Sequence, residues 1–214
     1  MPSSSQRSAA ARLPAPRLVR GKTLPESLRR RRTIREISDR PLPPQLLSNL
    51  LWAACGVNRR RGSFGYPGRT AASASDSQEI DLYVALENGV HLFDARRHRL
   101  IPVASGDLRT LAIGRGQQDM MTKAPVQLIY VVDIHRLTHT RGFQEPGLHD
   151  AEVQKSYYYV DTGLIAANVY LFAASQGLAC WFHNCDRAAL TRKLKLRAAQ
   201  RVLFAQTVGY PERR

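Results

Sequence analysis

The sequence predicts an α+β protein, with antiparallel hairpin strands and long helices packed on them. Three observations support this class. Asn88-Gly89 lies between two short apolar stretches, which is typical of a tight β-hairpin turn. Residues 126–132 form a continuous apolar run, as expected for a buried central strand. Residues 160–176 are apolar on nearly all sides at helical spacing, which predicts a deeply buried helix or a subunit interface.

The elements before the hairpin alternate between helices and irregular segments. An early proline and Glu26 start a helix at 24–28, which leads into a run of arginines. Apolar residues at helical spacing predict a second helix at 45–57. The Arg- and Gly-rich segment 58–69 is predicted to be a loop. The small residues at 70–77 predict either a flexible surface loop or a backbone that approaches a flat ligand closely.

The elements after the hairpin turn alternate between strands and helices. Apolar runs predict strands at 80–86, 90–94, 100–103, 178–183 and 201–211. A polar helical stretch is expected at 108–118. Gly177 is predicted to end the helix at 160–176, and Asp186 to cap the next helix. Residues 134–150 have little periodicity, so we expect a mobile loop or a short lid helix there.

The charge of the chain indicates an anionic ligand or partner. The formal net charge is +15, and residues 1–40 contain eleven Lys or Arg but three Asp or Glu. Such a charge attracts phosphorylated cofactors, nucleic acid or acidic membranes. No zinc-finger, RNA-recognition or basic-zipper motif is present, so a non-enzymatic nucleic-acid-binding protein is an alternative that rests on charge alone. No apolar run approaches the roughly 20 residues that span a bilayer, so we expect no membrane partner.

Residues 1–24 are rich in Ser, Ala, Arg and Pro and lack the apolar core of a secretory signal. They predict a flexible basic arm, for which a disordered leader, a transit-like targeting segment and a wrapping arm all remain open. The predicted domain therefore spans 25–214, which is long enough for one sizeable core.

The cysteines and histidines predict neither disulfides nor a metal. Cys55, Cys180 and Cys185 form no CxxC pair and are odd in number, which favours free thiols in a reducing compartment and hence a cytoplasmic protein. His135 and His139 stand four apart, as ligands on one helix face would. No glutamate lies where a metalloprotease needs one, so we expect no metal.

The segment 29–35 holds five arginines and a threonine. Guanidinium groups fit a phosphate bidentately, and a hydroxyl adds a short-range donor. The segment therefore predicts an anion site, with the phosphate of a bound cofactor as the favoured ligand. A solvated basic helix end and a nucleic-acid patch are the alternatives.

Four segments in order resemble the FMN-dependent nitroreductase superfamily, especially its members related to thiazoline and oxazoline dehydrogenases. Arg31-Arg32-Thr33-Ile34-Arg35 is similar to the family's Arg-Arg-Ser-x-Arg motif. Residues 69–75, followed by 78–84, resemble its Arg-Thr-Ala-Pro-Ser-Ala stretch and the strand after it. Residues 177–181 resemble the Gly-Leu-Gly/Ala turn after the long helix, and 208–211 resemble the closing strand.

The resemblance implies a central, mostly antiparallel sheet flanked by helices in an intertwined homodimer, with one FMN per subunit at the interface. Arg31, Arg32, Thr33 and Arg35 would bind the phosphate, ribityl or pyrimidine side of FMN. The remaining implied contacts are Ser73, Ala74 and Ser75 along the isoalloxazine, backbone amides at His183 and Asn184 near flavin N5 and O4, and Arg213 or Arg214 at the phosphate.

The activity that the resemblance implies is NAD(P)H-dependent ping-pong reduction of a nitroaromatic, quinone or similar small-molecule acceptor through flavin N5. No protein residue is expected to act as a nucleophile or acid–base catalyst. The alternative is a flavin dehydrogenase or oxidase that acts on a small or peptide-derived substrate. Ala72 replaces the family's usual proline, and Asp76 and Ser77 replace its asparagine and aromatic residue.

Overall fold

The computed structural model describes residues 10–17, 21–62, 64–114, 124–141 and 149–212. In this part of the chain, seven strands form one sheet in the order β1-β6-β5-β4-β7-β9-β8, and every neighbouring pair is antiparallel. The strands are β1 (Ala11–Arg12), β4 (Ile80–Leu86), β5 (Gly89–Asp94), β6 (Arg99–Ser105), β7 (Val126–Asp133), β8 (Ala179–His183) and β9 (Gln200–Gly209). The predicted α+β class with a large antiparallel sheet is confirmed.

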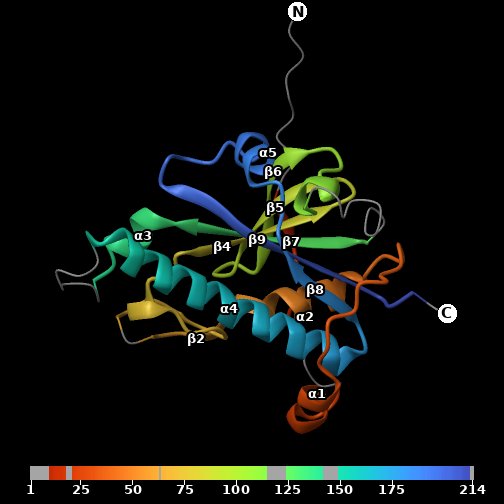
Figure 1. Ribbon diagram of the computed structural model, residues 1–214. Coiled ribbons are helices and arrows are strands. Elements are labelled where there is room, and N and C mark those ends of the chain that lie inside the picture. The colour runs from red at the N-terminus through yellow and green to blue at the C-terminus, as the bar shows by residue number, and fades with distance from the viewer. Residues whose placement is uncertain (1–9, 18–20, 63, 115–123, 142–148, 213–214) are drawn as a thin grey trace, which may run out of the picture.

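Helices cover both faces of this sheet (Figure 1). The described helices and 3₁₀ turns are α1 (Leu24–Arg30), α2 (Pro44–Cys55), η1 (Ala74–Asp76), η2 (Arg109–Ala112), α3 (Ile134–Thr138), α4 (Ala151–Gln176) and α5 (Arg187–Lys193). Alternate strand residues face α2 and α4 on one side, as Leu82 and Leu128 do. Their neighbours Tyr83 and Ile129 face α5 and η2 on the other side. Period-two alternation thus gives the sheet two buried faces.

The β4–β5 hairpin forms where the sequence predicts it. Leu86 pairs with Gly89 across a two-residue turn that contains Asn88. The φ of Gly89 is +149°, and a Cβ atom there would lie 2.5 Å from the Ala104 carbonyl oxygen. A glycine is therefore required both by the backbone conformation and by the close approach of β6.

Helix α4 is longer than the predicted 160–176 because Asp150 caps it earlier. The Asp150 carboxylate accepts hydrogen bonds from the amides of Glu152 and Val153, at 2.7 and 3.3 Å. Gly177 ends the helix with φ +71°, as predicted. The helix packs against α1 and α2, yet Val160 and Leu164 remain 60% and 42% exposed. One apolar face of α4 is therefore not covered by the part of the chain that the structure describes.

Two predicted segments differ from the structure. Residues 58–69 were expected to form a loop, but β2 (Val57–Arg59) and β3 (Gly68–Arg69) pair as a small antiparallel hairpin. Trp52 Nε1 donates to the Val57 carbonyl at 3.0 Å, which fixes the start of that hairpin against α2. The helical stretch expected at 108–118 is reduced, in its described part, to the single turn η2, and residues 115–118 lie outside the described residues.

Part of the predicted arm lies against the domain. Ala11 pairs with Leu100 at the edge of the sheet. The Arg17 amide donates to Asn49 Oδ1 at 2.8 Å, and Asn49 Nδ2 donates back to the Arg17 carbonyl at 2.7 Å. This described part, residues 10–17, is therefore bound to α2 rather than free, whereas the domain division at residue 25 stays a prediction.

Cys55 and Cys180 are buried, Cys185 is partly buried, and all three are free thiols, as expected. Within the described ranges, no helix combines the length and apolarity needed to cross a bilayer.

Candidate functional site

The arginine segment lies along the free edge of the sheet. Strand β8 is the last strand, so its outer backbone groups need partners from elsewhere in the chain. The Ile34 amide donates to the Cys180 carbonyl at 3.1 Å. Further along, Ile37 forms an isolated bridge with Pro211, and the Glu212 amide donates to the Glu36 carbonyl at 3.0 Å. The segment is thus held between β8 and the C-terminal end of the chain.

Three guanidinium groups of this segment have donors to spare. Arg31, Arg32 and Arg35 are exposed, and within the described part of the chain none of them forms a salt bridge. The Arg31 guanidinium lies 5.6 Å from the centre of the Tyr170 ring, and that of Arg35 lies 5.1 Å from the Trp181 ring. The cation–π contacts hold Arg31 and Arg35 while leaving their N–H donors available, so the arrangement suits a phosphate.

Tyr170 of α4 joins this segment to the edge strand. Its hydroxyl accepts a hydrogen bond from the Phe182 amide of β8 at 2.9 Å and lies 3.1 Å from Thr33 Oγ1. A helix side chain thus satisfies a backbone donor of the sheet edge and fixes the predicted Thr33 hydroxyl in place. Tyr170 was not predicted from the sequence. A tyrosine within an otherwise apolar helix was the available signal, since a buried hydroxyl needs a partner.

Tyr170→Phe is expected to lower the free energy of unfolding by about 1–3 kcal/mol, because the Phe182 amide loses its acceptor. Urea unfolding measures this loss. Tyr66→Phe is the control, because Tyr66 is exposed on a loop and should cost less than about 0.5 kcal/mol. Equal losses in the two variants would mean that the Tyr170 hydroxyl has no such role.

His183 and Asn184 lie at the end of β8, beside the arginine segment. His183 is buried; its Nδ1 donates to the Asn184 carbonyl at 2.8 Å, and its Nε2 lies 2.7 Å from Thr207 Oγ1. Burial lowers the pKa of His183, which keeps the ring neutral. Both ring nitrogens are therefore engaged within the protein, and the prediction for this turn concerns its backbone rather than the imidazole. Arg213 lies outside the described residues.

The small-residue loop lies elsewhere in the subunit. Its Ala74 amide donates to Asp161 Oδ2 of α4 at 2.8 Å, and Ser73 Oγ accepts from the Gln78 amide at 3.0 Å. Ser75 has φ +47°, a left-handed conformation that is uncommon for a residue other than glycine. Side-chain bonds from both ends of the loop thus hold a strained backbone.

A single chain does not bring the two halves of the predicted site together. The small-residue loop contacts α4 at Asp161, and the arginine segment contacts it at Tyr170. These positions are nine residues apart, which is about 13 Å along a helix and half a turn in direction. The loop and the arginine segment therefore lie on opposite sides of α4.

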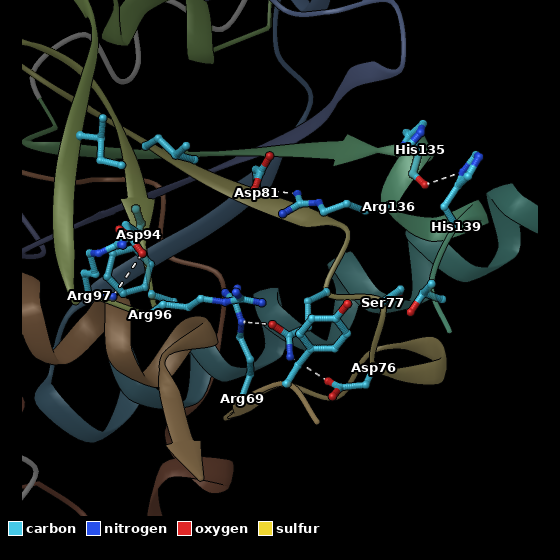
Figure 2. A pocket seen from close by; sticks show the side chains of 17 residues that line it. Arg69, Asp76, Ser77, Asp81, Asp94, Arg96, Arg97, His135, Arg136 and His139 are labelled. Atoms are coloured by element: carbon cyan, nitrogen blue, oxygen red, sulfur yellow. Dashed lines mark hydrogen bonds and ion pairs between the residues drawn. The ribbon is translucent and has the colours of Figure 1, made fainter. Parts of the chain in front are cut away.

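A cavity of about 480 Å³ adjoins the small-residue loop, with Asp76, Ser77 and Gln78 in its wall (Figure 2). Its charged groups are largely paired with one another. Arg136 pairs with Asp81 at 2.7 Å, while Arg69 Nε donates to Gln78 Oε1 and Gln78 Nε2 to Asp76 Oδ1, both at 2.8 Å. This wall braces the loop and offers an anion fewer free donors than the arginine segment does.

His135 and His139 also line this cavity, with their rings stacked at 3.9 Å between centres. Among the described residues, no group of three or more His, Cys, Asp or Glu side chains is arranged to hold a metal ion.

The large antiparallel sheet flanked by helices is the fold of the nitroreductases, and the chain belongs to the nitroreductase family. The family profile, described as "Nitroreductase family", matches residues 28–210. A protein of Methanocaldococcus jannaschii with a provisional nitroreductase name is 30% identical over 165 residues, which cover 72% of this chain and 75% of that protein.

Solved structures of similar fold agree with this assignment. One from Ralstonia eutropha, also provisionally named a nitroreductase, has a TM-score of 0.83 and 29% identity, and the match covers 100% of this chain and 94% of that one. The NADPH:FMN oxidoreductase of Vibrio harveyi, complexed with NAD⁺, has a TM-score of 0.60, 20% identity and coverage of 89% and 69%.

A third structure shares the fold, while the predicted branch of the superfamily stays a prediction. It is the Escherichia coli microcin synthetase McbBCD complex with truncated pro-MccB17, with a TM-score of 0.67, 15% identity and coverage of 83% and 68%.

Proposed function

We propose that this chain is an FMN-dependent oxidoreductase that uses NAD(P)H to reduce a small electron acceptor such as a nitroaromatic or a quinone. The observation that carries the proposal is the set of three exposed guanidinium groups, free of carboxylate partners among the described residues, on the sheet edge of a nitroreductase-family fold. A reducing cytoplasm is the proposed location.

The residues present fit an FMN phosphate. Arg31, Arg32 and Arg35 supply charge-assisted donors, and Thr33 lies among them with its hydroxyl oriented by Tyr170. Arg213 is proposed to complete this site, because Glu212 beside it is bonded to Glu36 next to the arginine segment. The turn at His183 and Asn184 is proposed to present backbone amides to the flavin ring.

FMN, when bound, supplies hydride chemistry at N5. The chain's own residues bind and orient it. Trp181 and Tyr170 hold the guanidinium groups in place, so little ordering remains to be done when the phosphate arrives. Backbone amides near the ring would stabilise negative charge on the reduced cofactor.

The site requires a second copy of the chain. Ser73, Ala74 and Ser75 lie across α4 from the arginine segment of their own subunit, so we propose that they contact the flavin ring held by the partner. Exposed apolar residues of α4 and α1 supply the interface for such a homodimer, such as Val160 and Leu164 on α4, and Leu24 and Leu28 on α1. Exposed apolar surface of this kind is typical of protein–protein contacts.

An absorbance spectrum tests the proposal most directly. The purified protein, or the protein mixed with FMN and then desalted, is expected to be yellow with bands in the blue and near ultraviolet. NADH or NADPH should bleach these bands under nitrogen, and an added quinone should restore them.

Two other outcomes point elsewhere. A flavin that neither nucleotide bleaches would favour the dehydrogenase or oxidase alternative, in which a different substrate is oxidised. A colourless protein that takes up no FMN, and binds duplex DNA with steep salt dependence, would favour the nucleic-acid-binding alternative.

A further inference from the structure

We infer that Glu79 and Asp161 share a single proton, and that this proton holds the loop from Ser73 to Gln78 in the position from which it meets the flavin. Both are positioning residues, and the inference rests on the proposed function. Neither residue was predicted from the sequence.

The two carboxyl groups are buried without a counter-charge. Glu79 is 0% exposed and Asp161 is 4% exposed. Within the described residues, no Lys or Arg forms a salt bridge with either. They lie within hydrogen-bonding reach of each other and line one small cavity of about 20 Å³. Two adjacent buried carboxylates cannot both remain ionised, so one of them retains a proton.

The hydrogen bonds indicate which group keeps it. Asp161 Oδ2 accepts from the Ala74 amide at 2.8 Å, which favours the charged form of Asp161. Glu79 Oε2 accepts from Ser77 Oγ at 2.6 Å, but among the described residues no group donates to Glu79 Oε1. A proton on Glu79 turns this carboxyl group into a donor toward the Asp161 carboxylate. We therefore place the shared proton on Glu79.

The pair is connected to the loop at both ends. Asp161 binds it at Ala74 and Glu79 binds it at Ser77. Between and beside these points, Ser75, Asp76 and Gln78 have φ of +47°, +54° and +50°. Three non-glycine residues in this region persist only where the surroundings fix them. From the cavity side, Figure 2 shows the chain from Arg69 through Gln78 to Asp76 that braces the same loop.

The charged and titratable groups around the pair are engaged elsewhere, so they do not neutralise it in place of this proton. On β3, Arg69 donates to Gln78 Oε1 and to the Cys55 carbonyl. Burial raises the pKa of Cys55 on α2, so its thiol stays neutral. On β4, Asp81 is paired with Arg136 of α3, whose guanidinium contacts Glu79 at its backbone carbonyl and lies 3.8 Å from Asp133 Oδ2. The Asp133 amide of β7 donates to that same carbonyl.

The direction of the pH effect follows. Burial, and then the neighbouring Asp161, raise the pKa of Glu79 from an ordinary 4.5 to about 7. Burial also raises the pKa of Asp161. Because the folded-state pKa lies above the unfolded one, the folded protein keeps the proton up to about pH 7 and loses it above. The loop is therefore held below about pH 7 and released as the pH rises through that value.

FMN binding measured by fluorescence quenching at several pH values tests this inference. For the wild type, the affinity is expected to fall on the order of tenfold between pH 6 and pH 8, in proportion to the protonated fraction. Glu79→Gln keeps a neutral donor in place at every pH, so its affinity should lose this fall. Glu87→Gln, at an exposed glutamate of the β4–β5 turn, is the matched control and should follow the wild type. In Asp161→Asn the midpoint should move to lower pH, because the neighbouring charge is gone.

Thermal melting of the FMN-free proteins separates the two proposals. Glu79→Gln should melt above the wild type at pH 8, and this difference should shrink as the pH falls toward the ordinary pKa of 4.5, whether or not FMN binds. If neither the wild type nor any variant binds FMN at any pH but this difference in melting temperature appears, the proposed function fails and the shared proton stands. If the wild type binds FMN with a pH profile that Glu79→Gln does not alter, the inference is overturned and the proposed function stands.

Discussion

Replacing Arg31 and Arg35 together with alanine is expected to weaken FMN binding on the order of 100-fold or more. Hydrogen bonds between a guanidinium and a phosphate contribute about 1.5–3 kcal/mol each, and the two losses multiply in the equilibrium constant. Both side chains are exposed and lie on aromatic rings, so their removal should leave the fold intact. Quenching of FMN fluorescence on titration measures the dissociation constant.

Arg59→Ala is the control for loss of positive charge. Arg59 is an exposed arginine of β2 whose described side-chain bond goes to Asn58 Oδ1 at 2.9 Å, away from the arginine segment. It should change FMN binding less than about threefold, through the general field alone. If Arg59→Ala weakened binding as much as the double variant, long-range charge would account for retention and the phosphate site would be misplaced.

The arginine segment was predictable from sequence, whereas the parts that position it were not. Five arginines within seven residues stand out in any reading of the chain. The tyrosine that anchors Thr33 lies 137 positions away, and the bond exists only because α4 crosses the edge of the sheet there. Likewise, nothing in the local sequence connects Glu79 with Asp161, although a carboxylate inside an apolar helix signals a specific partner.

Elements with an apolar pattern in their own sequence were predicted, and elements that depend on distant contacts were not. The strands at 80–86 and 126–132 were confirmed because alternating or continuous apolar runs reflect their burial directly. The β2–β3 hairpin was missed because its Arg- and Gly-rich residues carry no such pattern. Contacts with α2 stabilise it instead, including the bond from Thr70 Oγ1 to the Trp52 carbonyl at 3.1 Å.

Val160→Glu combined with Leu164→Glu is expected to give a monomer that no longer retains FMN. The two side chains, 60% and 42% exposed, lie one turn apart on the uncovered face of α4. In the single chain they already contact water, so carboxylates there should leave the subunit folded. In a dimer they would be buried, and two unpaired charges per subunit would cost several kcal/mol each. Sedimentation and FMN titration measure the two effects.

Val103→Glu is the matched control. Val103 is 37% exposed and lies on β6, at the opposite end of the strand order from β8. It should leave the molecular mass and FMN binding unchanged. Because the small-residue loop and the arginine segment lie on opposite sides of α4, we expect that one subunit alone does not enclose the cofactor and that loss of the dimer removes half of the contacts. A monomeric double variant that bound FMN as tightly as the wild type would show that a single chain completes the site, and the two-copy arrangement would be wrong.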